Sequence, residues 1–434
     1  MKVLYAYRLK NNALEKLPLK EFKESKEEKN LLNVYPVEKE ELFGFGGAIT
    51  DSAAYNYSLL KKDDKRRVLE YLFGETGLRY NICRVCIGSS DFAREEYCYV
   101  QKDDFDLKTF SVEKDEQYII PFIKDVLNYT ENTIYIYASP WSPPAFMKTV
   151  DTRFRGGKLK EEYYELYAEY IVRFLKAYEE RGINISALTL QNEPNAAPMW
   201  ESCVFTAKEE AAYARVLKAE LNKNGYSHVK LFAWDHNKER LYERADEVFS
   251  ETGDIVDGAA FHWYSGEHFG AIKAVKRKYP QKIVFASEFC LSEKEDKTDT
   301  KYFNEILGDI DAGANAICEW NLLLDERGGP YHNRAGGCDA PVRIDSVLKK
   351  IKKSGIYNEI YMFSHFIQRG AKSLYTSSFT YDILISAVKN PNGAVVVNIV
   401  NMSGKTYDAK LYFDKQTLDV EIDEKAKYVF VFQQ

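Results

Sequence analysis

Short apolar runs alternate with amphipathic stretches from Phe43 to about Trp320. In the amphipathic stretches, such as residues 160–182 and 207–225, apolar residues recur three and four positions apart and a glycine ends the pattern, which predicts helices. The apolar runs predict strands at residues 43–49, 81–88, 133–139, 185–191, 229–234, 256–263, 282–288 and 314–320. Eight strands with intervening helices predict an α/β fold, a closed (β/α)8 TIM barrel, rather than an open doubly wound sheet.

The pattern changes after about Ala371, where short alternating strands are separated by turns such as residues 390–393. This segment predicts a smaller all-β, sandwich-like domain. Its core is too small to stand alone, so we expect it to pack on the barrel and to recruit strands from the N-terminus. We therefore predict N-terminal strands at 1–41, the barrel at 42–368 and the β-domain at 369–434.

Charge and cysteine usage exclude several classes of protein. The net charge is −6 and acidic and basic residues are interspersed, which argues against a nucleic-acid-binding surface. No stretch of about 18 apolar residues predicts a membrane span, and residues 1–20 lack the apolar run of a secretory leader. Seven cysteines, an odd number without a leader, predict reduced thiols and a cytoplasmic location. The composition indicates nothing about the oligomeric state.

Two predicted strands lead into glutamates. The run 185–191 is followed by Glu193, and the run 282–288 ends at Glu288. In β/α barrels the carboxyl ends of the strands form the active site. Glycosidic cleavage needs one carboxylic acid to protonate the leaving oxygen and one carboxylate to attack the anomeric carbon. A single glutamate at a strand end is more often a surface or helix-terminal charge, but a pair on this architecture favours catalysis.

The other predicted strand ends are polar and aromatic, and they supply Asp91, Phe92, Trp141, Asp235, His262, Trp263 and Trp320. Indole faces pack on the C–H faces of a sugar while carboxylates bond to its hydroxyls, so this grouping predicts a carbohydrate site. Arg84 lies on the inward face of its strand, where an unpaired guanidinium is costly. We expect it beside Glu288 or Asp235, lowering the carboxylate pKa. A purely structural ion pair is the alternative.

Two further motifs do not predict a cofactor or a metal. Residues 44–49 begin like a dinucleotide-binding GxGxxG loop, but Ile49 stands where the third glycine belongs. The six histidines show no HExxH-type spacing, so no zinc site is predicted.

Seven segments in the same order as in a known family run through the whole predicted barrel. They are GFGGAITDSAA (44–54), RVCIGSSDF (84–92), ASPWSPPAFMKT (138–149), LQNEP (190–194), FHWY (261–264), FASEF (285–289) and WNLLLDERGGP (320–330). In these segments the chain resembles glycoside hydrolase family 30, and specifically its glucosylceramidase-like branch.

The resemblance implies a retaining mechanism in which Glu193 is the acid/base and Glu288 the nucleophile. It implies that Tyr264 bonds to the nucleophile and that the cleaved sugar contacts Asp91, Trp141, Asn192 and Trp320. The wider set of expected substrate contacts adds Arg84, Phe92, Asp235, His262 and Trp263. A proton donor at neutral pH needs a raised pKa, so we expect one for Glu193 in the free enzyme.

The expected function is hydrolysis of β-linked glucosides or gluco-oligosaccharides by double displacement, without a cofactor. Asp91 and Trp141 favour a gluco-configured sugar, and the cytoplasmic location favours an imported oligosaccharide or small glycoside. An endo-β-1,6-glucanase, a β-xylosidase and a β-fucosidase stay open within the family. A transglycosylase and a non-catalytic sugar-binding barrel are the alternatives outside hydrolysis.

Overall fold

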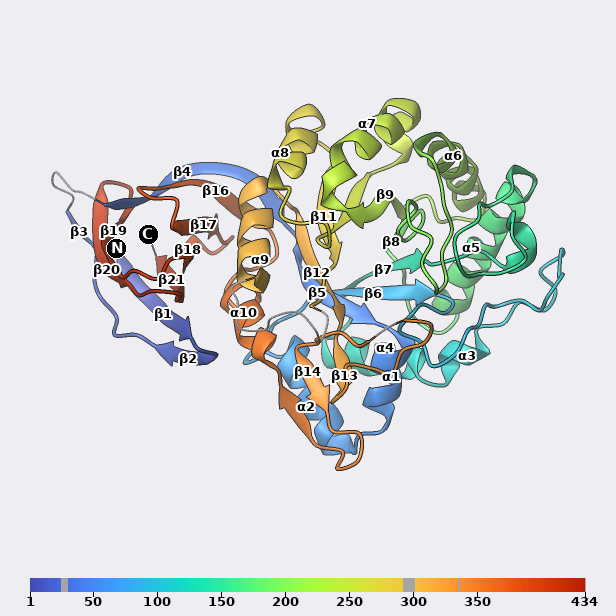
Figure 1. Cartoon of the computed structure of the whole chain (residues 1–434), viewed down its shortest axis with the longest axis horizontal. Coiled ribbons are helices and arrows are strands. Elements are labelled where there is room, and N and C mark those ends of the chain that lie inside the picture. The colour runs from blue at the N-terminus through green and yellow to red at the C-terminus, as the bar shows by residue number, and fades with distance from the viewer. Residues whose placement is uncertain (25–29, 292–300, 335, 434) are drawn as a thin grey trace.

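The computed structural model describes residues 1–24, 30–291, 301–334 and 336–433. It consists of a closed barrel of parallel strands and a separate β-sheet domain that contains both chain termini (Figure 1). The predicted TIM barrel with an all-β domain is therefore confirmed. No helix within the described ranges is long and apolar enough to cross a membrane.

The barrel closes where its last strand pairs with its first. The strands are β5 (Gly44–Ile49), β6 (Ile82–Ile87), β7 (Tyr135–Pro140), β8 (Ala187–Thr189), β9 (Lys230–Asn237), β10 (Gly258–His262), β11 (Ile283–Glu288) and β12 (Ala316–Asn321). Each overlaps one of the eight predicted runs, and β12 pairs in parallel with β5. Strands such as β6 and β10 are buried at every residue, as a sheet covered on both faces requires.

Helices cover the outside of the barrel (Figure 1). They are α1 (Asp51–Ser58), α2 (Lys62–Phe73), α3 (Glu113–Glu116), α4 (Ile119–Tyr129), α5 (Tyr164–Glu179), α6 (Ala207–Lys223), α7 (Leu241–Thr252), α8 (Phe269–Lys278), α9 (Lys301–Ala312) and α10 (Gly355–Ser364). The two helices predicted from periodicity correspond to α5 and α6. A capping box of Thr206 and Glu209 starts α6, which satisfies two backbone donors at its first turn.

The β-domain combines strands from both ends of the chain, as predicted. Its strands are β1 (Lys2–Lys10), β2 (Ala13–Lys16), β3 (Lys23–Glu24), β4 (Leu31–Leu42), β16 (Ala371–Ser378), β17 (Ile383–Lys389), β18 (Ala394–Asn401), β19 (Tyr407–Phe413), β20 (Gln416–Ile422) and β21 (Lys427–Gln433). They form one sheet in the order β2-β1-β21-β18-β17-β16-β4-β19-β20-β3. Pairing of β1 with β21 and of β4 with β16 joins the two termini.

Helices α9 and α10 lie between the barrel and the β-domain (Figure 1). Glu359 of α10 forms a buried ion pair with Lys427 of β21 at 2.9 Å. The Asn398 side-chain amide donates to the Met362 carbonyl at 2.8 Å. A further small sheet of β13 (Leu323–Asp325), β14 (Val342–Ile344) and β15 (Ile351–Lys353) follows the barrel and was not predicted, because three-residue strands have too few positions to show alternation.

A buried carboxylate anchors the segment between β6 and α4. Tyr97, Tyr99 and Tyr178 each donate a hydroxyl hydrogen bond to Asp115, at 2.8, 2.6 and 2.7 Å. Three donors satisfy a carboxylate that has no access to solvent. Because Asp91 belongs to the same segment, this network helps to position a residue predicted to contact substrate.

Tyr178→Phe removes one of these bonds and is expected to lower the free energy of unfolding by about 1.5–3 kcal/mol, the usual contribution of a hydrogen bond to a charged group. Burial raises the pKa of Asp115 to about 6, so urea unfolding should be followed at pH 8, where the group is ionised. Tyr213→Phe is the matched control, since the buried Tyr213 hydroxyl bonds to none of the described residues. Equal destabilisation of both variants would contradict the anchoring role.

Candidate active site

The two predicted glutamates line one cavity. Glu193 follows β8, Glu288 is the last residue of β11, and both contribute to a cavity of about 350 Å³ at the carboxyl end of the barrel. Glu193 has a left-handed backbone with φ of +49°, a conformation that costs about 1–3 kcal/mol for a residue with a side chain. Its N–H donates to the Asp235 carbonyl at 3.0 Å, which helps to hold this turn. The residues are therefore placed as the sequence predicted.

Glu288 accepts hydrogen bonds from two side chains. The Arg84 Nη1 lies 2.6 Å from one carboxylate oxygen, and the Tyr264 hydroxyl donates to the other at 3.1 Å. Both contacts were predicted from the sequence. The cation and the hydroxyl donor hold the orientation of the carboxylate.

Arg84 is fully buried and shared among several partners. Its Nη2 donates to the side chains of Asn192 and Asp235, both at 2.8 Å. The guanidinium also lies 4.8 Å from the ring centroid of Trp141 and 5.3 Å from that of Trp320. The predicted partner was Glu288 or Asp235, and the structure shows both. Two carboxylates and two aromatic faces offset the cost of burying this cation.

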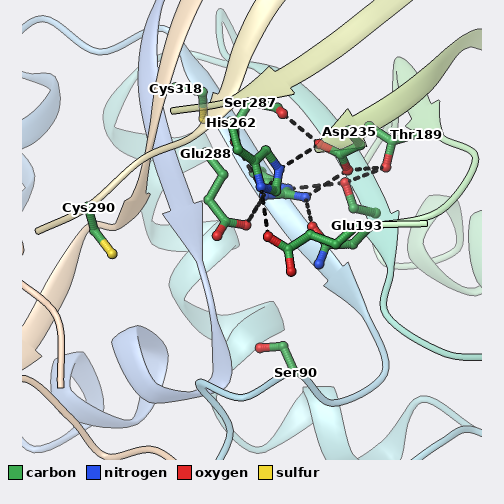
Figure 2. Close-up of polar contacts among 12 residues, drawn as sticks. Ser90, Thr189, Glu193, Asp235, His262, Ser287, Glu288, Cys290 and Cys318 are labelled. Atoms are coloured by element: carbon green, nitrogen blue, oxygen red, sulfur yellow. Dashed lines mark hydrogen bonds and ion pairs between the residues drawn. The ribbon is translucent and has the colours of Figure 1, made fainter. Parts of the chain in front are cut away.

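Asp235 links Arg84 to His262, and its contact with His262 can be followed in Figure 2. It accepts hydrogen bonds from the hydroxyls of Thr189 and Ser287 and lies 3.1 Å from the Nε2 of His262. Burial raises the pKa of Asp235, but Arg84 and His262 outweigh burial and hold the pKa below its ordinary value. Asp235 is therefore a buried anion between two cationic groups.

The environment of Glu193 contradicts the expected raised pKa. Burial alone raises the pKa of its carboxyl, but His236 and His262 outweigh burial and lower it. The Nδ1 atoms of these rings lie 3.6 and 3.2 Å from one Glu193 oxygen. Burial lowers the pKa of His262, but Glu288, Asp235 and Glu193 together raise it to about 9. The two shifts favour a proton on His262 over one on Glu193, a result that the sequence around Glu193 does not reveal.

Four of the predicted sugar contacts line the cavity: Asp91, Trp141, Asn192 and Tyr264. Trp320 is not among the lining residues but stacks on Trp141, with ring centroids 5.1 Å apart. Trp320 therefore packs against the Trp141 ring without lining the cavity itself.

The other five predicted contacts do not line the cavity. Arg84 contacts Glu288 and His262 contacts Glu193, while the Asp235 side chain bonds to both Arg84 and His262 and touches neither glutamate. Phe92 packs edge-on against Trp320, and Trp263 packs on Phe289 and Tyr302. We therefore correct the expectation that these five residues contact the sugar. The sequence shows which residues stand at a strand end, but the direction of each side chain depends on the local register of the strand. That register shifts between Phe261 and His262 of β10.

Sequence reasoning missed several residues of the cavity. Trp200, Cys290, Lys301, Arg334 and Cys338 also line it. Arg334 forms an ion pair with Asp91 and lies over the ring of Phe92. Arg334 and Cys338 come from the irregular segment between β13 and β14, where no periodic pattern indicates that the chain returns to the barrel.

Glu193, His236 and His262 form a cluster that histidine spacing did not predict. Their ligand atoms all lie within 4.8 Å of one another, close enough for one metal ion. The two histidines come from β9 and β10, so their proximity depends on strand pairing. Protonation of His262, which its raised pKa favours, competes with metal binding because a histidine ligand must be neutral.

Comparison with known proteins agrees with this geometry. Residues 42–367 match the model of the glycosyl hydrolase family 30 TIM-barrel domain. The lysosomal acid glucosylceramidase of Mus musculus is 30% identical over 404 residues, covering 86% of this chain and 78% of the relative. SrfJ from Salmonella typhimurium has a TM-score of 0.95 at 28% identity over 100% of both chains, and the endo-β-1,6-glucanase BT3312 has 0.88 at 25% identity over 99% of both. The match covers the whole barrel and both candidate glutamates, so the chain is a glycoside hydrolase that belongs to glycosyl hydrolase family 30.

Proposed function

We propose that this protein is a retaining β-glycosidase that hydrolyses β-linked glucosides or gluco-oligosaccharides. The observation that carries the proposal is the shared cavity of Glu193 and Glu288, whose walls also include Asp91, Trp141 and Asn192. An acid, a nucleophile and a sugar platform are thus in reach of one anomeric carbon.

The reaction proceeds by double displacement. Glu288 attacks the anomeric carbon while Glu193 gives a proton to the leaving oxygen, and a glycosyl ester forms on Glu288. Water then gives a proton to Glu193 and attacks the same carbon, which releases Glu288 and a sugar of retained β configuration. Arg84 and Tyr264 hold the Glu288 carboxylate in its orientation at the start of each cycle.

His262 stores the proton that the reaction needs. In the free enzyme the ring holds it, which the raised pKa of His262 and the lowered pKa of Glu193 support. A sugar that fills the cavity removes water from Glu193, which disfavours its charged form. The proton then moves along the 3.2 Å contact between Nδ1 of His262 and the Glu193 oxygen. The expected raised pKa of Glu193 is thus replaced by a proton shared with a neighbour.

Two observations support a glucose-type sugar. Asp91, held by Arg334, offers a carboxylate to hydroxyls beside the Trp141 face. The glucosylceramidase and the endo-β-1,6-glucanase described above both have names that specify glucosyl substrates. Endo-β-1,6-glucanase activity is the second candidate, favoured by the fold match over 99% of both chains. The cytoplasmic location and an imported substrate stay predictions, which cell fractionation would test.

Glu288→Ala is expected to lower turnover of an aryl β-glucoside on the order of 10³-fold or more, because no nucleophile remains. Glu193→Ala with added azide should give a β-glycosyl azide, since azide attacks the glycosyl ester in place of activated water. Glu288→Ala should give no β-glycosyl azide. The products are identified by NMR, and Glu95→Ala, at an exposed glutamate, is the control. Wild-type turnover in both cavity variants would refute the assignment.

His262→Gln is expected to move the alkaline limb of the kcat/KM profile to lower pH. The pKa of His262 is raised to about 9. The pair of His262 and Glu193 therefore keeps its shared proton below that pH and loses the proton as the pH rises through that value. Without the ring, the Glu193 carboxyl alone holds the proton and releases it at lower pH. Rates from about pH 4 to pH 10 measure this, with exposed His228→Gln as control. An unchanged limb would contradict proton storage on His262.

A panel of aryl β-glycosides tests the sugar. The kcat/KM for the glucoside is expected to exceed that for the xyloside by about tenfold or more, because a site built around polar groups rejects a sugar that lacks a hydroxymethyl group. The fucoside and β-1,6-linked gluco-oligosaccharides complete the panel. Preference for the xyloside would overturn the gluco assignment, and exclusive cleavage of internal β-1,6 bonds would favour the second candidate.

A further inference from the structure

Two free cysteines meet in the wall of the catalytic cavity. Cys290 follows Glu288 by two residues, and Cys338 lies between β13 and β14. Their sulfur atoms are 2.7 Å apart, and both residues line the cavity that contains Glu193 and Glu288. In Figure 2 Cys290 lies on the side of Glu288 that is away from Glu193. Among the described residues no other two cysteines are in such contact.

The pair lies between two groups of the active site. The Cys290 sulfur is 3.5 Å from the Tyr264 hydroxyl, which bonds to Glu288. The Cys338 sulfur accepts from Arg334 at 3.4 Å, and Arg334 forms the ion pair with Asp91. Any group attached to either sulfur would therefore project into the space where the sugar binds.

We propose that Cys290 and Cys338 form an oxidisable dithiol that reacts with small-molecule disulfides entering the cavity and closes to an intramolecular disulfide. The cavity gives a reagent access to both sulfurs. An S–S bond is about 2.03–2.05 Å long. The present separation of 2.7 Å means that closure moves the sulfurs by less than their own radius, so the cavity walls stay in place.

The chemistry balances without a further reactant. One protein thiol loses its proton and attacks a sulfur of the small disulfide, which forms a mixed disulfide and releases one small thiol. The second protein thiol loses its proton and attacks the protein sulfur of the mixed disulfide, which releases the second small thiol. The protein loses two hydrogen atoms, its dithiol is oxidised to a disulfide, and the small disulfide is reduced to two thiols.

The consequence is protection of the cavity. A mixed disulfide that stayed on Cys290 or Cys338 would occupy the sugar site. The neighbouring protein thiol displaces the small thiol from the mixed disulfide and so clears the cavity. Burial raises the pKa of the Cys290 thiol, so the thiolate is scarce at neutral pH and the reaction is expected to accelerate as pH rises.

The test incubates the folded, full-length protein with oxidised glutathione at pH 8.5 and measures its intact mass. The wild type is expected to lose two hydrogen atoms and to yield one cross-linked peptide that contains Cys290 and Cys338. Cys338→Ser cannot close the ring and is expected to gain one glutathionyl group on Cys290. Cys98→Ser, at a cysteine outside the cavity, is the control and should behave like the wild type.

Activity on an aryl β-glucoside, compared with the same protein before oxidation, gives a second readout. The wild type is expected to keep most of its activity, while Cys338→Ser should lose about tenfold or more because the adduct blocks the cavity. Reduction with dithiothreitol should restore the activity of the Cys338→Ser variant. The activity measurement rests on the proposed function, but the mass measurement does not. A failure of the proposed function can therefore be distinguished from a failure of the dithiol proposal.

Two results would overturn the proposal: a wild type whose mass is unchanged, or a wild type that keeps the glutathionyl adduct. Cys290→Ser is the reciprocal variant and should carry the adduct on Cys338. If circular dichroism shows that both serine variants are misfolded, the cross-linked peptide of the wild type decides alone, because its presence supports the dithiol and its absence refutes it.

Discussion

A buried cation organises the active site. The Arg84 guanidinium has no solvent contact and donates to Glu288, Asp235 and Asn192. Removing one partner from a buried ion pair typically costs about 3–5 kcal/mol, because the remaining charge stays buried. The carboxyl ends of β9 and β11 and the turn after β8 are therefore tied to β6 by one residue. The position of Glu288 follows from this requirement.

The arginine alone does not balance the charge. Asp235 and Glu288 are both held by Arg84, and Glu193 adds a third carboxylate to the same site. His262 contacts all three carboxylates, which is why its pKa rises although burial opposes the charged ring. The raised pKa of His262 favours a proton beside Glu193, in a site that lacks the apolar pocket that usually raises the pKa of a carboxyl group.

The barrel supplies this constellation, whereas segments outside the strands shape the space around it. The segment that carries Asp91 is fixed through Asp115 and its three tyrosines. The segment between β13 and β14 brings Arg334 and Cys338 to the same cavity, where Arg334 pairs with Asp91. Such segments vary among proteins that share a barrel, and they decide which sugar and which leaving group fit. The family of this chain therefore specifies its chemistry more closely than its substrate.

The order of strands and helices, the recruitment of N-terminal strands to the β-domain and the two glutamates could all be predicted, because apolar periodicity is local and the family segments contain the strand ends. The contacts of Arg84 were also predicted, since a guanidinium inside a barrel must find carboxylates. The sequence by itself determined these features. Only the tertiary structure decided that Trp141 faces the cavity while Trp263 packs away from it, that His236 and His262 lie beside Glu193, and that Cys290 meets Cys338. The reason is physical: side-chain direction, proton affinity and sulfur proximity depend on register shifts and on contacts between segments far apart in the chain, which no local pattern encodes.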